Sequence, residues 1–278
     1  QMGNEAHSGP NYRRVVELVR SGAIGEVREV HCWCDQAWGN FDRPPHAAPV
    51  PPNLDWDLWL GPAPHRPYHP CYHPAAWRSW WDFGNGRLGD MGCHMLDLPF
   101  WALDLKHPLT VEAEGPPVKP ESSPLWLICH WEFPARGDLP PVKLTWYDGD
   151  KRPTLQKEHD MPNYHEGTLF VGSEGMLIAD YGHHVLYPKE KFTDFQRPPQ
   201  TIPDSPGHFQ QWFAACKTGS PTGTHFGYSG PLTETVLLGT VAYRMGQKLE
   251  WDAENLKVTN CPEANEYIQR EYRKGWTL

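Results

Sequence analysis

The order of strand-like and helical segments along the chain is the feature that most restricts its fold. Short runs rich in Val, Ile, Thr and aromatic residues lie between residues 111 and 186, separated by Gly, Pro and Asp. A further alternating run at 25–34 also predicts a strand. Helical patterns surround these strands, at 12–21, 54–60, 93–103, 205–218, 232–247 and 261–274. No β–α–β alternation occurs, and no G-x-G-x-x-G follows a strand. We therefore expect an α+β fold with a largely antiparallel sheet.

Charge and composition exclude several classes of protein. The 278 residues carry a formal net charge of −9 without a basic block, which disfavours nucleic acid and anionic membranes as partners. No apolar run approaches ~18 residues, so no membrane span is expected. Seven irregularly spaced cysteines without a CxxC pair favour free thiols, with one or two disulfides as the alternative. We expect a soluble protein, either cytoplasmic or periplasmic. The sequence does not decide between these compartments, because it starts on Gln and the true N-terminus is uncertain.

The strongest candidate site is the glycine-rich stretch at residues 77–94, WRSWWDFGNGRLGDMGCH. Asp90 and His94 are four residues apart, so a helix places them on one face, where a carboxylate can orient an imidazole for acid/base work. Arg78 offers planar donors to an oxygen-rich ligand, and Trp80 and Trp81 offer flat faces to a sugar ring. The alternative is a capped helix with Asp90 at its start and a buried His94.

Weaker candidates lie outside this stretch. The motif HPCYH at 69–73 has metal-capable residue types at close spacing, although prolines interrupt it. The alternative is that these loop residues line a polar pocket, where Tyr72 and His73 donate hydrogen bonds to the hydroxyls of a ligand. His165 follows a tyrosine at the edge of a strand. His7 lies in a loop before the first helix, where it either lines a pocket or is solvated.

Three stretches resemble the Gfo/Idh/MocA family of glucose–fructose oxidoreductases and inositol dehydrogenases. They are QMGNEAH at 1–7, RRVVELVRSGAIGEVREVHCW at 13–33 and WRSWWDFGNGRLGDMGCHMLD at 77–97. The resemblance implies a Rossmann domain followed by an α/β domain with a large, open, mostly antiparallel sheet and helices on one face. It divides this chain into a junction segment, 1–25, left from the boundary with a missing Rossmann domain, and a substrate and oligomerisation domain, 26–278.

The resemblance also implies roles for residues of the glycine-rich stretch. His94 would be the general acid/base on a sugar hydroxyl, Asp90 would orient His94 or bind substrate, and Arg78 would lie near substrate or cofactor. The family's cofactor loop and its E-K-P lysine are absent from this sequence. NAD(P) is therefore expected only with an upstream Rossmann domain. Without that domain we expect no cofactor, or a divalent metal ion at the site.

Three functions follow from this reading. The first is a sugar oxidoreductase that acts on a sugar or glycoside. The second is a cofactor-independent sugar lyase or glycoside hydrolase that uses Asp90 and His94 with help from Tyr72, Arg78 or His165. The third is a non-catalytic carbohydrate-binding or assembly module. We also expect a homo-oligomer formed through the open sheet, because a face rich in Trp and Val would otherwise be exposed.

Overall fold

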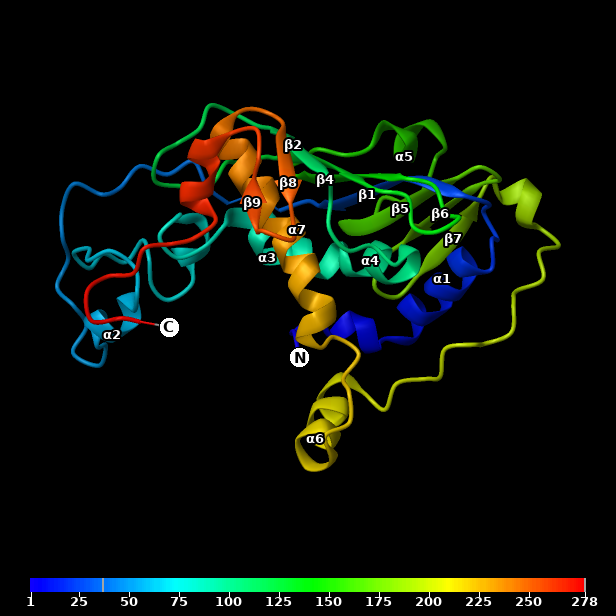
Figure 1. The fold of residues 1–278 in the computed structure, drawn as a ribbon, viewed down its shortest axis with the longest axis horizontal. Helices are drawn as coiled ribbons and strands as arrows, with labels where there is room; N and C mark the ends of the chain where they lie inside the picture. Colours follow the sequence, from blue (N-terminus) through cyan, green and yellow to red (C-terminus); the bar gives the residue numbers. More distant parts are fainter. Residues whose placement is uncertain (37, 278) are drawn as a thin grey trace.

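A nine-stranded sheet forms the centre of the molecule in a computed structural model that describes residues 1–36 and 38–277 (Figure 1). The strand order is β7-β6-β5-β1-β4-β3-β2-β8-β9. Strand β1 pairs in parallel with β4, and the remaining pairs are antiparallel. The strands are β1 Val27–Cys34, β2 Thr110–Glu114, β3 Ile128–Phe133, β4 Val142–Asp148, β5 Glu166–Gly172, β6 Met176–Ala179, β7 His184–Tyr187, β8 Leu249–Asp252 and β9 Lys257–Val258. The predicted α+β fold with a mostly antiparallel sheet is confirmed.

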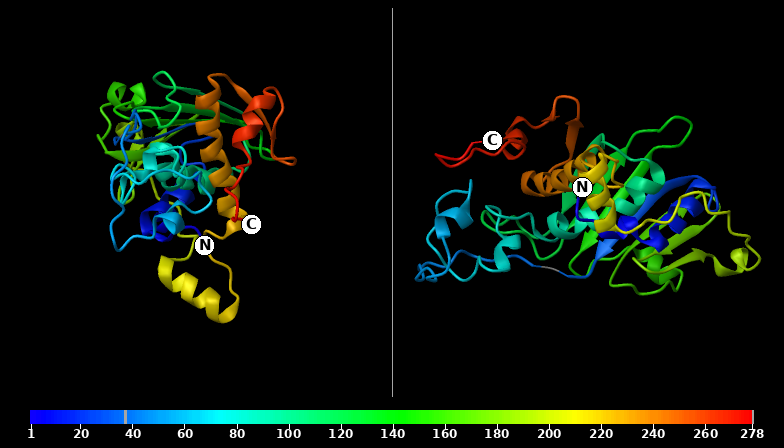
Figure 2. Two further views of the ribbon diagram at one scale, coloured as in Figure 1. Left: turned by 90° about the vertical axis from the view of Figure 1, so that its left-hand side faces the viewer. Right: turned by 90° about the horizontal axis from the view of Figure 1, so that it is seen from below.

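A layer of helices covers one face of the sheet (Figures 1 and 2). It consists of α1 Pro10–Arg20, α3 Gly86–Met95, α4 Asp97–Leu103 and α7 Phe226–Met245. The shorter helices are α2 Trp56–Leu60, α5 Thr154–Glu158 and α6 His208–Thr218, with 3₁₀ turns η1 Glu5–Ser8, η2 Ala76–Ser79, η3 Lys189–Phe192 and η4 Pro262–Tyr267. Helix α6 stands away from the body and has no buried residue; its Phe209, Trp212 and Phe213 are exposed.

Sheet residues that face the helices form an apolar core. Val30, Leu144 and Trp131 are neighbours across β1, β4 and β3, and all three are fully buried. The pairing of β1 with β5 shifts in register between Val27 and Glu29, which brings Val30 and Cys32 to the core side after Val27. The sequence pattern predicts this slip, because strict alternation from Val27 would point Val30 the other way.

The second face of the sheet differs from the exposed Trp- and Val-rich surface that the sequence suggested. Trp33, Leu169 and Ile178 are fully buried on this face, in a cluster with Met161 of the segment that follows α5. The uncovered part is polar: Lys143, Glu132 and Glu112 are exposed on this face. That premise for an oligomer is therefore wrong, and assembly through the sheet stays a prediction.

Two helices in the sequence-based assignment need correction. The predicted helix 93–103 is two helices, because the chain turns at Leu96 and α3 already begins at Gly86; Pro99 lies in the first turn of α4, as its missing N–H requires. The predicted helix 261–274 is wrong, because only a 3₁₀ turn forms over Pro262–Tyr267. Within the described residues, none of the helices is long and apolar enough to cross a membrane.

Residues 1–25 pack onto the remainder rather than stand apart. Asn11 on α1 donates through Nδ2 to the carbonyls of Asp180 and His183, 2.9 and 3.0 Å away. The carboxylate of Glu17 accepts from the backbone of Thr201 at 2.7 Å. These contacts fix α1 against the sheet edge; the assignment of 1–25 as a junction segment stays a prediction.

Glycines allow α3 and α7 to approach each other closely. A Cβ on Gly92 would lie 3.0 Å from the side chain of Val236, and one on Gly239 would lie 2.7 Å from Leu88 and 2.8 Å from Trp131. Real Cβ atoms essentially never make contacts as short as those at Gly239, and the contact at Gly92 is tighter than most, so packing favours glycine at both positions. The crossing sets the position of α3, which carries Asp90 and His94.

We predict that Gly239→Ala destabilises the protein by about 1–3 kcal/mol through overpacking at this crossing. Urea denaturation measures the change. Gly230→Ala on the same helix is the matched control, because nothing lies within 4 Å of its added Cβ; it should change stability by less than about 1 kcal/mol. Equal effects at the two positions would contradict a tight crossing.

A buried acid adds a pH dependence to stability. Burial raises the pKa of the Asp148 carboxyl, at the end of β4, from 3.8 to about 7. Between pH 3.8 and about 7 the folded state therefore keeps a proton on Asp148 that the unfolded chain releases. As pH rises through this range, Asp148 lowers the free energy of unfolding. His184 acts in the opposite sense, because burial lowers the pKa of its imidazole to about 4.

Asp148→Asn removes the titrating carboxyl and keeps an acceptor for the indole N–H of Trp146, which donates to Oδ2 at 2.9 Å. Relative to the original protein, we expect the variant to gain stability as pH rises from 3.8 to about 7. The difference between the two urea curves at each pH isolates Asp148 from His184. A difference that does not change with pH would show that Asp148 is ionised throughout.

Candidate functional site

The glycine-rich stretch forms the start of α3 and places Asp90 on its surface. Gly86 opens the helix with a φ of +65°, and a Cβ there would lie 2.5 Å from the side chain of Ser123. This glycine therefore permits close packing of the chain on itself. Asp90 and His94 lie on one helix, as predicted, but Asp90 is inside the helix rather than at its cap.

The Asp90 carboxylate is held by two arginines. Arg78 Nε lies 3.2 Å from Oδ1, and Arg87 Nη1 lies 3.4 Å from Oδ2. The Asp90 side chain keeps 28% of its surface exposed, so the carboxylate remains accessible to a ligand. His94, one turn further along α3, is partly buried. No hydrogen bond joins it to Asp90 in the part of the chain that the structure describes. The predicted orientation of His94 by Asp90 therefore has no contact behind it.

Arg87 connects Asp90 to the sheet. Its Nη2 donates to Cys34 Sγ at 2.9 Å, and its guanidinium lies 4.5 Å from the ring centre of Trp38. Burial raises the pKa of the Cys34 thiol, which Arg87 only partly opposes. Cys34 is thus a neutral acceptor at the end of β1, not a reactive thiolate.

Asp90 lines a cavity of about 670 Å³. The residues around it combine aromatic, cationic and carboxylate side chains: Gln36, Trp38, Phe41, Ala75, Ala76, Arg78, Ser79, Arg87, Met91 and Glu166. Sequence reasoning found only Arg78 and Asp90 among them. Arg87 had a signal, since it lies within the same glycine-rich stretch; Trp38 and Glu166 had none, because the fold alone brings them there.

Several predicted binding residues lie elsewhere. Tyr72 and Trp80 are buried in an aromatic cluster with Trp56, so neither ring offers a face to a ligand. The Tyr72 hydroxyl accepts from Arg43 at 2.9 Å, and the indole N–H of Trp80 donates to the Cys71 carbonyl at 2.9 Å. Both assignments are corrected: these aromatic residues stabilise the loop that precedes α3.

The other three aromatic candidates also fall outside the cavity. His73 packs edge-on against Trp59. Trp81 lines a different cavity of about 550 Å³, where the Arg244 guanidinium lies 5.2 Å from its ring. His165 is 93% exposed on the surface, and its ring Nδ1 lies 3.0 Å from Asp35. Among the described residues, no group of three or more His, Cys, Asp and Glu side chains suits a metal ion.

His7 belongs to a second, buried polar cluster. Its Nδ1 lies 2.9 and 3.1 Å from the two carboxylate oxygens of Asp97, which is fully buried at the start of α4. The Tyr228 hydroxyl donates to Asp97 Oδ1 at 2.6 Å, and Trp101 stacks on the imidazole at 4.0 Å. Burial, reinforced by the carboxylate of Asp97, raises the pKa of Tyr228 well above its usual value. Neither Asp97, the last residue of the stretch 77–97, nor Tyr228 was among the predicted site residues.

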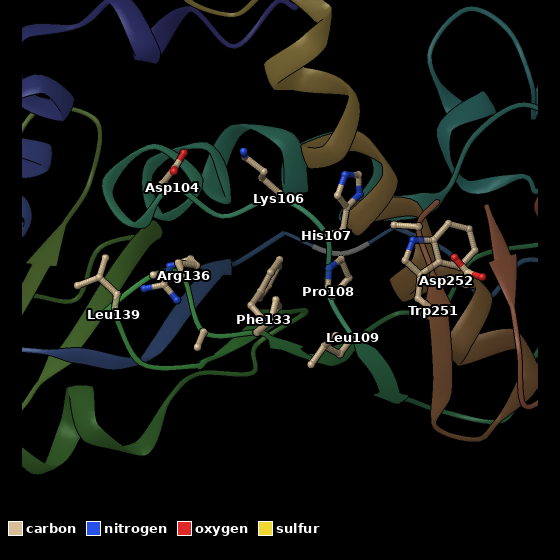
Figure 3. A pocket seen from close by; sticks show the side chains of 14 residues that line it. Asp104, Lys106, His107, Pro108, Leu109, Phe133, Arg136, Leu139, Trp251 and Asp252 are labelled. Atoms are coloured by element: carbon tan, nitrogen blue, oxygen red, sulfur yellow. The ribbon is translucent and has the colours of Figure 1, made fainter. Parts of the chain in front are cut away.

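A cavity of about 840 Å³, larger than the one at Asp90, lies between the segments 104–109, 133–139 and 251–253 (Figure 3). Figure 3 shows Phe133 at its centre, with Arg136 and Leu139 on one side and His107 and Trp251 on the other. None of the predicted site residues lines it. Size alone therefore does not identify the site.

Comparisons with known proteins identify the class. Residues 27–137 match the model of the oxidoreductase family's C-terminal alpha/beta domain, GFO_IDH_MocA_C2. Over this segment, the predicted resemblance to Gfo/Idh/MocA proteins is thus confirmed. No match is found among curated proteins.

Solved structures share the fold at low sequence identity. An oxidoreductase from Thermotoga maritima has a TM-score of 0.50 at 15% identity, over 90% of this chain and 61% of its own. An NAD-binding protein from Listeria innocua has 0.54 at 12%, over 89% and 66%. GenD2 from gentamicin A biosynthesis, in complex with NAD, has 0.53 at 17%, over 90% and 63%. This chain therefore spans less than two thirds of each of these proteins.

The buried cluster around Asp97 predicts a stability effect. Tyr228→Phe removes one donor from a buried carboxylate, which should cost about 1–3 kcal/mol in urea unfolding. Tyr272→Phe is the control, because that hydroxyl makes no hydrogen bond to another described residue; it should change stability by less than about 0.5 kcal/mol. Identical midpoints for the two variants would show that the Tyr228 bond adds nothing.

Proposed function

We propose that this chain is the substrate-binding, proton-transferring part of an oxidoreductase that acts on a hydroxyl group of a sugar or glycoside. One observation carries the proposal. The ion-paired Asp90 lines a 670 Å³ cavity on a helix that also bears His94, within the segment that matches an oxidoreductase family's C-terminal domain.

The composition of the cavity supports a polyhydroxylated ligand. Arg78, Arg87 and Asp90 offer donors and acceptors that are already fixed by their mutual ion pairs. Trp38 and Phe41 add aromatic surface for the apolar faces of a sugar ring. Pockets of this kind, mostly apolar with a few placed polar groups, are typical of small-molecule sites of about 300–1,000 Å³.

Oxidation of an alcohol requires removal of the hydroxyl proton, and this is the step that side chains perform. The His94 imidazole, on the same helix as Asp90, is the group assigned to accept that proton and to return it in the reverse direction. Asp90 accepts a hydrogen bond from a hydroxyl of the substrate, while Arg78 and Arg87 keep the carboxylate in place.

The described residues do not fit a nicotinamide dinucleotide. Residues 84–89 read G-x-G-x-x-G and open α3, but a turn precedes them where a dinucleotide fold has a strand. The space beside Gly86 is filled by Ser123. We therefore derive no hydride step within this chain; an NAD(P) cofactor would be held by other residues.

The proposal predicts the effect of two substitutions on turnover. In an assay that also supplies the residues that hold NAD(P), with NAD(P)⁺ and a panel of hexoses and glycosides, His94→Gln should lower kcat by about 10²–10⁴, because the acid/base group is lost. Asp90→Asn should chiefly raise KM. His159→Gln, at an exposed position, is the control and should not change either constant.

Turnover that is unaffected by His94→Gln would contradict the assigned acid/base role. Turnover of a glycoside with all dinucleotide removed would favour the lyase or hydrolase alternative over the oxidoreductase.

A further inference from the structure

We propose that the ligand of this site is extended: a glycoside or oligosaccharide with one ring at Asp90 and a second ring on an aromatic surface formed by Trp59, Trp77 and Phe83. The inference rests on the proposed function, because Asp90 marks the position of the first ring.

Cavities with shared walls lead away from Asp90. The 670 Å³ cavity shares Arg78 and Asp90 with a neighbouring cavity of about 250 Å³. That cavity in turn shares Trp77 and Phe83 with a third, of about 340 Å³. The first cavity alone has the volume of an ordinary small-molecule site. The other two are additional space, arranged in series along one side of the segment 77–90.

The third cavity offers the surfaces that a sugar ring needs. Trp59, Trp77 and Phe83 are partly exposed and present aromatic surface, and Asp82 and Arg270 add polar groups at the wall. Aromatic rings accept the apolar face of a pyranose, while carboxylate and guanidinium groups bind its hydroxyls. Both kinds of group occur together here.

Contacts with the surrounding residues hold this aromatic surface in place. Trp59 stacks on Trp56 at 4.7 Å, and Phe83 meets Trp59 edge-on at 4.9 Å. On the other side of the surface, the Arg78 guanidinium lies 4.8 Å from the centre of the Trp77 ring. A preorganised surface loses little conformational entropy when a ligand binds.

The carboxylates behind this surface are already paired with arginines, which holds the wall in place. Arg43 and Arg66 both pair with Asp82, at 2.6 and 2.8 Å, and both also reach Glu121. Two guanidinium groups thus face two carboxylates. Arg270 adds a third guanidinium at the wall, so this side of the cavity offers several hydrogen-bond donors to the hydroxyls of a sugar.

The test compares one ring with two by isothermal titration calorimetry on the full chain. The probes are methyl glycosides of glucose, galactose and mannose, and the disaccharides maltose, cellobiose, lactose and mannobiose. We expect at least one disaccharide to bind about tenfold more tightly than the methyl glycoside of its component ring.

Trp77→Ala should remove this preference and leave the affinity for the methyl glycoside unchanged, whereas Trp77→Phe should retain most of it. Arg270→Ala, at an exposed side chain that carries little risk to folding, should weaken only the disaccharide. Trp212→Ala, on α6 and 47% exposed, is the matched tryptophan control and should have no effect.

Equal affinity for one and two rings, or a disaccharide preference that survives both Trp77→Ala and Arg270→Ala, would overturn the extended site while leaving the proposed function intact. Failure of every probe to bind would overturn the carbohydrate assignment itself, and the extended site with it.

Discussion

A single buried carboxylate joins parts of the chain that are far apart in sequence. Asp97 begins α4, and it receives hydrogen bonds from His7 in the first ten residues and from Tyr228 in the first turn of α7. A buried charge without partners costs several kcal/mol, so the N-terminal turn, α4 and α7 are held in one arrangement. Because α3 leads directly into α4 and crosses α7, the position of Asp90 depends on this network.

The sequence predicted the fold well where a local pattern coincides with tertiary packing. The strand at 25–34 and the helix at 12–21 are amphipathic by themselves, and both form as expected. The start of α3 was missed, because glycines at 84, 86 and 89 resemble a loop. A distant contact explains the glycine at 86: it makes room for Ser123, and no pattern near Gly86 reveals this contact.

The candidate site was predicted in part, for a similar reason. Asp90 and Arg78 could be found, since charged residues in a short motif have few structural uses. The aromatic residues could not be sorted, because a ring that binds a sugar and a ring that fills a core have the same sequence signature. Trp80 proved to be core, whereas Trp77, three residues earlier, is partly exposed beside the cavity. Only the packing of Trp56, Tyr72 and Trp80 against one another separates the two cases.

The position of β1 in the sheet has a consequence for synthesis of the protein. β1 is the first strand in the chain, yet it lies near the middle of the sheet, where Cys34 is opposite Asp148 on one side and Glu166 on the other. A nascent chain therefore carries this apolar strand, with both edges unpaired, until β4 and β5 have left the ribosome. Such late pairing slows folding and exposes a strand that can join a neighbouring chain.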